Sequence, residues 1–121
     1  MYKRQYLFIT GRKKDLIIRG GENISPGEIE NTLSAHPAIE EVSVIGVPDA
    51  EWGEVVKAVI VLKAGATVTV PELVAYTKSH LSSFKAPQYY AVTDELPRNA
   101  LGKVLKNDLR QLFGAGKNEG I

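Results

Sequence analysis

The sequence predicts a small α+β sandwich with the element order ββαββαβα, in which helices pack on a short sheet. Three observations support this fold class. Short, β-rich runs are separated by turn residues. Two Ser/Thr-x-x-Glu spacings, from Ser25 to Glu28 and from Thr69 to Glu72, have the form of capping boxes at helix starts. The chain of 121 residues has no internal repeat and no long linker, and therefore fits one domain.

Five β-rich runs predict the strands. They span residues 6–10, 16–19, 42–45, 54–62 and 89–93, and the third ends at the segment Gly46-Val47-Pro48-Asp49. A charged turn separates the first two runs, which favours a pair of linked strands. The fourth run is almost entirely apolar, which is typical of a central strand.

Three segments are predicted to be helical, and two further segments to be irregular. The helices span residues 25–36, 69–83 and 104–113, where apolar side chains recur at helical intervals. Residues 20–23 form a predicted loop, because paired glycines permit positive φ angles. Residues 114–121 are expected to form a flexible tail.

A single domain is predicted at residues 6–113, between the two ends of the chain. Residues 1–5, Met-Tyr-Lys-Arg-Gln, belong to no periodic pattern. Back-translation as ATG TAT AAG AGA CAG resembles a transposase adapter used in sequencing libraries. We therefore interpret residues 1–5 as a non-native leader, joined to a reading frame that is truncated upstream.

Composition excludes several classes of function. Fifteen basic and fourteen acidic residues give a formal charge of +1, without the basic run that is typical of a nucleic-acid binder. The absence of cysteine excludes disulfides and thiolate metal sites, and two isolated histidines predict no metal site of their own. No apolar run is long enough to span a bilayer, and no signal peptide is visible. A cytoplasmic location is expected.

Three segments together carry a resemblance to a known family. They are ITGRKKDLIIRGGENISPGEIE at residues 9–30, GVPD with WGE at residues 46–54, and LPRNALGKVLK at residues 96–106. They resemble the C-terminal domain of the adenylate-forming enzymes, which include acyl-CoA synthetases, nonribosomal peptide adenylation domains and luciferases. The similarity is greatest to acyl-CoA synthetases of the fatty-acid or malonyl-CoA ligase type.

The resemblance implies a two-step ligase. A carboxylate and Mg-ATP would give an acyl-adenylate and pyrophosphate, and the thiol of coenzyme A would then give the thioester and AMP. The domain would serve both steps by rotating against its own N-terminal domain, which would bind most of the ATP and the magnesium. Because that domain is missing here, the isolated chain is expected to be inactive.

Lys103 matches the family's catalytic lysine of adenylation. Adenylation brings an anionic carboxylate to an anionic phosphate, and a positioned ammonium offsets their repulsion. The flexible lysine stem and the preceding Gly102 suit insertion into a partner's cleft. A surface lysine at a helix start is the alternative.

Two residues of the first segment match other family positions. Lys14 matches the hinge, where the backbone must change conformation while its side chain stays in water. Arg12 matches the arginine that approaches the nucleotide, and its five donors suit that role. A salt bridge from Arg12 to Asp15 or Glu28 is the alternative.

Coenzyme A is expected at two further places. Gly20 and Gly21 match the loop that lines the pantetheine tunnel, where a side chain would obstruct the thiol. Both glycines could equally serve a turn. Phe84 and Lys85 would stack on and pair with the CoA nucleotide, although Phe84 is as well suited to the core.

Two other functions remain open on the sequence. A peptide-synthetase adenylation domain would deliver the acyl group to a carrier protein, but the Trp52-Gly53-Glu54 segment favours a CoA ligase. A stand-alone module that binds a nucleotide or a protein would have no reason to keep the Gly-Lys pair at 102–103. His36 and His80 lie near helix ends, where capping or surface roles are expected.

Overall fold

The computed structural model describes residues 15–82 and 85–121. Along these residues the order of elements is β1 (Ile17–Arg19), β2 (Glu22–Ile24), α1 (Pro26–Ser34), β3 (Ile39–Asp49), β4 (Gly53–Leu62), α2 (Val70–His80), β5 (Tyr89–Val92) and α3 (Lys106–Phe113). The predicted strand at 6–10 lies outside the described residues. Helices packed on a mostly antiparallel sheet confirm the α+β class.

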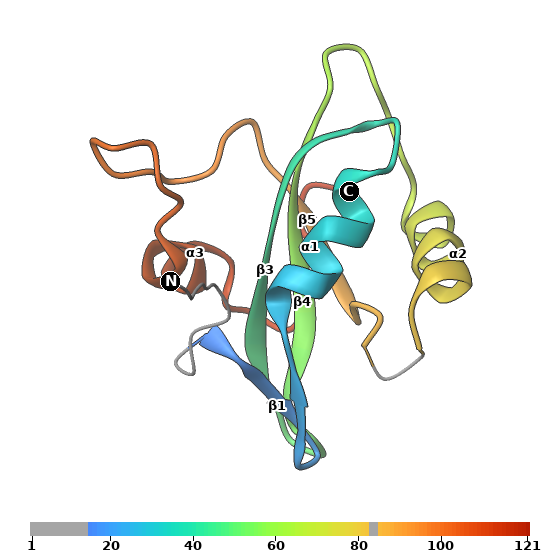
Figure 1. Cartoon of the computed structure of the whole chain (residues 1–121), viewed down its shortest axis with the longest axis vertical. Helices are drawn as coiled ribbons and strands as arrows, with labels where there is room; N and C mark the ends of the chain where they lie inside the picture. The colour runs from blue at the N-terminus through green and yellow to red at the C-terminus, as the bar shows by residue number, and fades with distance from the viewer. Residues whose placement is uncertain (1–14, 83–84) are drawn as a thin grey trace, which may run out of the picture.

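The sheet is built around β4, as its apolar sequence predicts (Figure 1). β3 pairs with it in antiparallel register, from Ile39–Leu62 to Asp49–Gly53. β5 pairs with its middle in parallel, and β1 contacts its start through Arg19 and Gly53. β2 extends the sheet beyond β1.

The first hairpin differs from the sequence prediction in its second strand. Residues 22–24 form β2 and pair with β1, although residues 20–23 were expected to be a loop. Gly20 and Gly21 have φ angles of 58° and 90°, and such paired positive angles make a two-residue turn that matches the twist of a hairpin. The two glycines therefore reverse the chain within two residues.

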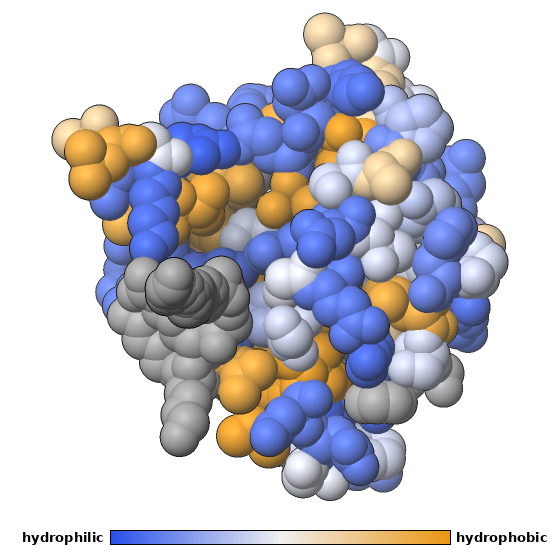
Figure 2. All heavy atoms as spheres, viewed as in Figure 1, coloured by the Kyte–Doolittle hydropathy of each residue, from blue (hydrophilic) through white to orange (hydrophobic). Residues whose placement is uncertain are grey.

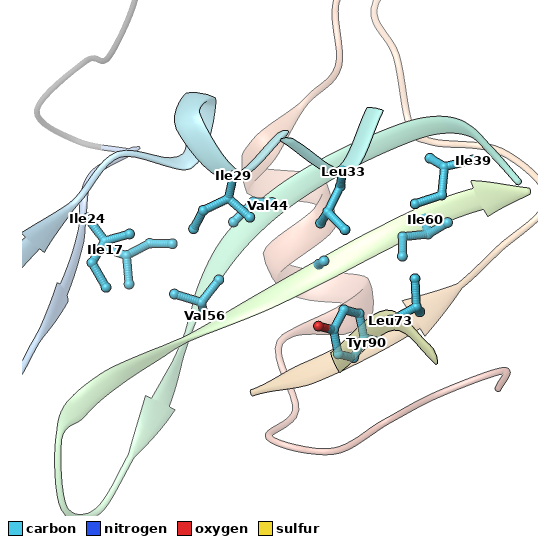
Figure 3. Packing of buried hydrophobic residues seen from close by; sticks show 11 residues of the cluster. Ile17, Ile24, Ile29, Leu33, Ile39, Val44, Val56, Ile60, Leu73 and Tyr90 are labelled. Atoms are coloured by element: carbon cyan, nitrogen blue, oxygen red, sulfur yellow. The ribbon is translucent and has the colours of Figure 1, made fainter. Parts of the chain in front are cut away.

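Hydrophobic clusters cover both faces of the sheet. Alternation along β4 sends Val56 and Ile60 to one face and Val55 and Val59 to the other. The first face is covered by α1 and α2, whose side chains meet the sheet in Figure 3. The second is covered by α3 and by the segment that precedes it. In Figure 1, α1 is drawn over the sheet, α2 lies to its right and α3 to its left.

Only one of the two predicted capping boxes forms. Thr69 accepts from the Glu72 backbone N–H, while the Glu72 carboxylate accepts from the Thr69 N–H at 2.8 Å. Ser25 occupies the N-cap of α1 but makes no side-chain cap hydrogen bond. Glu28, its expected partner, pairs instead with Lys85.

Residues 114–121 differ from the expected flexible tail. Glu119 bridges β5 in parallel, and its backbone exchanges hydrogen bonds with Tyr90 and Val92 at 3.0 and 2.9 Å. The fully buried Lys57 on β4 donates to the Ala115 carbonyl and pairs with the Glu119 carboxylate. Sequence periodicity cannot show such contacts, because they join residues about 60 positions apart.

Among the described residues, no helix combines the length and apolar character required to cross a membrane.

Candidate functional site

Lys103 lies on a tight turn that projects from the domain, at the upper left of Figure 1. Arg98 and Val104 bridge its two arms in antiparallel fashion. Gly102 has a φ of 85°, and its N–H donates to the Asn99 carbonyl at 2.9 Å. A turn closed by a positive-φ glycine is a common way to reverse a hairpin. The hydrogen bonds of this turn therefore determine where the backbone of Lys103 lies.

The side chains at the tip of this turn are open to solvent. Leu101 is 92% exposed, and Lys103 is exposed beside it. Figure 2 shows apolar spheres at the end of the projecting loop. No hydrogen bond or ion pair joins the Lys103 ammonium to another described residue. The ammonium is therefore available to an anion supplied from outside the described chain.

Beneath the turn, a polar cluster joins α3, α1 and β3. Lys106 donates to Glu30 Oε2 at 2.5 Å and to the Val44 carbonyl at 2.7 Å. The same Glu30 oxygen accepts from the Val44 N–H at 2.8 Å. A hollow of about 290 Å³ lies between this cluster and the turn, and its lining includes Glu30, Glu41 and Arg98. The cluster fixes the start of α3, three residues after Lys103.

Gly20 and Gly21 form the tip of the first hairpin, at the bottom of Figure 1. Gly20 lies against Trp52: a Cβ added there would come within 2.7 Å of the indole, and the Gly20 N–H donates to the Trp52 carbonyl at 2.8 Å. The Arg19 guanidinium stacks over the same indole at 4.2 Å. No atom lies within 4 Å of a Cβ placed on Gly21. Gly20 is thus required by packing, whereas Gly21 faces open space.

The remaining predicted site residues are placed only in part. Arg12, Lys14 and Phe84 lie outside the described residues. Lys85 is half-buried and donates to both oxygens of Glu28, at 3.0 and 3.2 Å. The carboxylate of α1 therefore already neutralises the cation that was expected to meet the CoA nucleotide.

Other candidate side chains have structural contacts. Asp15, an alternative partner of Arg12, pairs with Arg110 of α3 at 3.0 Å. The rings of His36 and His80 both pack on Tyr76, at centroid distances of 4.8 and 4.4 Å. These contacts agree with the structural roles expected for the two histidines.

The structure keeps the two predicted reaction elements apart. The turn bearing Lys103 and the Gly20–Gly21 turn lie at different ends of the domain in Figure 1.

Sequence reasoning missed the residues that hold the Lys103 turn, above all Arg98 and Asn99. The signal was present in Asn99-Ala-Leu-Gly102, because Asn at the first position of a type I turn is a known preference. The link from Arg98 to Glu41 on β3 carried no local signal, because 57 residues separate the two.

Comparisons with known proteins agree with this geometry. The family model described as the AMP-binding enzyme C-terminal domain matches residues 28–103. A feruloyl-CoA synthase of an Amycolatopsis species is 46% identical over 90% of this chain and 22% of its own length. An indoleacetate–CoA ligase of Aromatoleum aromaticum is 50% identical over 88% of this chain and 21% of its own.

A solved structure shows the same fold. The ATP-bound MatB from Rhodopseudomonas palustris superposes with a TM-score of 0.82 at 44% identity, over 85% of this chain and 20% of that one. The chain thus spans about a fifth of the length of the relatives that it matches.

Proposed function

This chain belongs to the AMP-binding enzyme C-terminal domain family, and we propose that it is the mobile C-terminal domain of an ATP-dependent acid–CoA ligase. The whole enzyme would convert a carboxylic acid, ATP and coenzyme A into acyl-CoA, AMP and pyrophosphate. The described domain would provide one group for each of its two steps.

The observation that carries the proposal is the ammonium of Lys103, which has no ion-pair partner among residues 15–82 and 85–121 and lies on a hydrogen-bonded, projecting turn. In adenylation, a carboxylate oxygen attacks the α-phosphorus of ATP and pyrophosphate leaves. Lys103 would contact the oxygens on which negative charge gathers, and exclusion of water by the second domain would strengthen that contact.

The Gly20–Gly21 turn would act in the second step. Attack of the CoA thiol on the acyl carbon requires a narrow path for pantetheine. Gly21 leaves open space beside its backbone, which suits the wall of such a path. Lys14 would be the hinge and Arg12 would contact the nucleotide. Phe84 with Lys85 would meet the CoA nucleotide at the rim, where Lys85 would have to exchange its pair with Glu28 for that contact.

The missing partner is the enzyme's own N-terminal domain. Magnesium would enter with ATP and be held mainly by that partner. The chemistry requires ATP and CoA, and we place the enzyme in the cytoplasm.

The acid is assigned only by class. The names of the relatives include feruloyl, indoleacetate and long-chain fatty acid ligases, which differ in the size and aromaticity of the acid. Their shared chemistry is a carboxylate and a CoA thiol. CoA is therefore favoured over a carrier protein as the acceptor.

The test requires a complete ligase that contains this domain. We expect Lys103→Ala to lower ATP–pyrophosphate exchange by about 10²- to 10³-fold, the effect of removing one transition-state contact. Thioester formation from a synthetic acyl-adenylate should largely persist. Lys78→Ala removes an exposed lysine from α2 and is the matched control. Equal loss of both steps in Lys103→Ala would refute the assigned role.

A further inference from the structure

The turn that carries Lys103 is held by the side chains of Arg98 and Asn99, which lie on its first arm. Asn99 Oδ1 accepts from the Leu101 N–H at 2.9 Å and from the Lys103 N–H at 3.0 Å. The backbone N–H of Asn99 donates to the Lys103 carbonyl, again at 2.9 Å. Both peptide groups of Lys103 are therefore held by Asn99.

Arg98 connects this turn to the sheet. Its guanidinium donates to the Gly102 carbonyl at 2.7 Å and pairs with the Glu41 carboxylate of β3. One planar group thus joins the residue before the lysine to a strand that is anchored in the core. On the other side of Lys103, the Leu105 N–H donates to the Pro97 carbonyl at 2.9 Å.

These contacts are not needed to bury the turn. Arg98, Asn99, Leu101 and Lys103 are all exposed. Hydrogen bonds between exposed groups add little to the stability of a domain, because water competes for both partners. The hydrogen bonds of Arg98 and Asn99 restrict the turn to one conformation. Such a restriction is most useful where the turn must deliver a side chain to a defined position.

We propose that Asn99 is a positioning residue, whose side-chain oxygen fixes the backbone from which Lys103 reaches the adenylation site, with Arg98 fixing the turn to β3. The inference rests on the proposed function, because it concerns the same lysine. A lysine side chain has four rotatable stem bonds, and a mobile backbone would add further freedom. Holding the backbone removes that part of the entropy before substrate arrives.

The complete enzyme provides the decisive test. We expect Asn99→Ala to lower ATP–pyrophosphate exchange by between about tenfold and about a hundredfold, the range associated with misplacing a reacting group. Thioester formation from a synthetic acyl-adenylate should be unchanged. Asn99→Asp keeps an acceptor oxygen at the same distance along the side chain, and should restore exchange to within about threefold of wild type. Asn107→Ala is the matched control, because it removes an exposed amide that accepts from Arg110 on α3.

Three results would overturn the inference: exchange in Asn99→Ala equal to that in Asn107→Ala, equal losses in both half-reactions, or Asn99→Asp as slow as Asn99→Ala. Lys103→Ala is measured in parallel. If Lys103→Ala retains full exchange, the proposed function fails; if it loses exchange while Asn99→Ala does not, only the positioning role fails.

Hydrogen exchange in the 121-residue chain gives a readout that does not depend on activity. The amides of Leu101 and Lys103 should be protected in wild type and in Asn99→Asp, and should exchange faster in Asn99→Ala. The amide of Leu73 in α2 should be equally protected in all three proteins. Rapid exchange of the Lys103 amide in wild type would contradict the inference directly.

Discussion

At the scale of single residues, Tyr90 combines a fully buried ring with a polar hydroxyl. The ring belongs to the cluster beneath α2, and its hydroxyl lies 3.2 Å from Thr77 Oγ1. Thr77 donates in turn to the Val74 carbonyl at 3.1 Å. Burial raises the pKa of Tyr90 above its ordinary value of 10.0, and the hydrogen bond to Thr77 opposes that rise only in part.

This shift predicts a loss of stability in alkali. The folded state holds the Tyr90 proton more tightly than the unfolded state. The stability that this difference contributes is therefore complete below about pH 10, and it declines as the pH rises toward the pKa of Tyr90 in the folded state. Urea unfolding between pH 8 and 11 should show a declining free energy of unfolding. Tyr90→Phe should flatten that decline, whereas Tyr89→Phe, one position earlier on β5, should leave it as in wild type. Parallel declines in wild type and Tyr90→Phe would contradict the prediction.

Residues that follow a local pattern could be predicted, and residues that depend on distant partners could not. Thr69 and Glu72 form their capping box because both partners lie within one helical turn. The Ser25 box has the same spacing, but Lys85 approaches Glu28 from 57 positions away and pairs with it. The helix predicted at 104–113 sets Lys103 just before α3, and the structure has an exposed turn there; the catalytic role of Lys103 stays a prediction.

At the scale of elements, the first hairpin illustrates the same distinction. A strand was predicted at 16–19, because the run contains Leu16 and the β-branched Ile17 and Ile18, and β1 forms at Ile17–Arg19. β2 was not, because Glu22 and Asn23 have polar side chains that remain exposed. Their pairing with β1 follows from the two-glycine turn, which sets the register of both strands.

The tip of this hairpin allows the tunnel assignment to be tested. In the complete enzyme, Gly21→Leu should impair thioester formation from a synthetic acyl-adenylate while sparing ATP–pyrophosphate exchange. A leucine there also strains the backbone, by about 1–2 kcal/mol at a positive φ. Gly65 has a φ of 77° and open space around it, so Gly65→Leu reproduces that strain at the other end of the sheet. Similar effects of both variants on thioester formation, or loss of exchange alone in Gly21→Leu, would count against the assignment.

At the scale of the whole molecule, the last residues of the chain pack on the face of the sheet that α3 also covers. Lys57 lies in the middle of β4 with no exposed side-chain area, on the same face as Val55 and Val59. Its ammonium has two partners about 60 positions away in the sequence, the Ala115 carbonyl at 2.8 Å and the Glu119 carboxylate. A buried charge is tolerated only when it is paired and hydrogen-bonded. Residues 114–121 therefore complete the packing of β4.

Glu119→Ala tests this closure. It leaves the Lys57 ammonium with the Ala115 carbonyl alone, and we expect the free energy of unfolding to fall by about 2 kcal/mol. The fall should stay below that for a fully enclosed pair, because the Glu119 side chain is 27% exposed and water can partly replace it. Glu51→Ala, at an exposed position in the turn between β3 and β4, is the matched control in urea unfolding.

A double-mutant cycle separates the ion pair from the backbone pairing of the tail. In a Lys57→Met background no buried charge needs a partner, so Glu119→Ala should have a much smaller effect than in wild type. The backbone bonds of Glu119 with Tyr90 and Val92 remain in every variant, and the difference between the two backgrounds therefore measures the side-chain pair alone. If residues 114–121 were a flexible tail, Glu119→Ala would match Glu51→Ala in both backgrounds. A coupling near zero would thus restore the interpretation that the sequence favoured, whereas a coupling of about 1–2 kcal/mol would show that the tail is part of the folded domain.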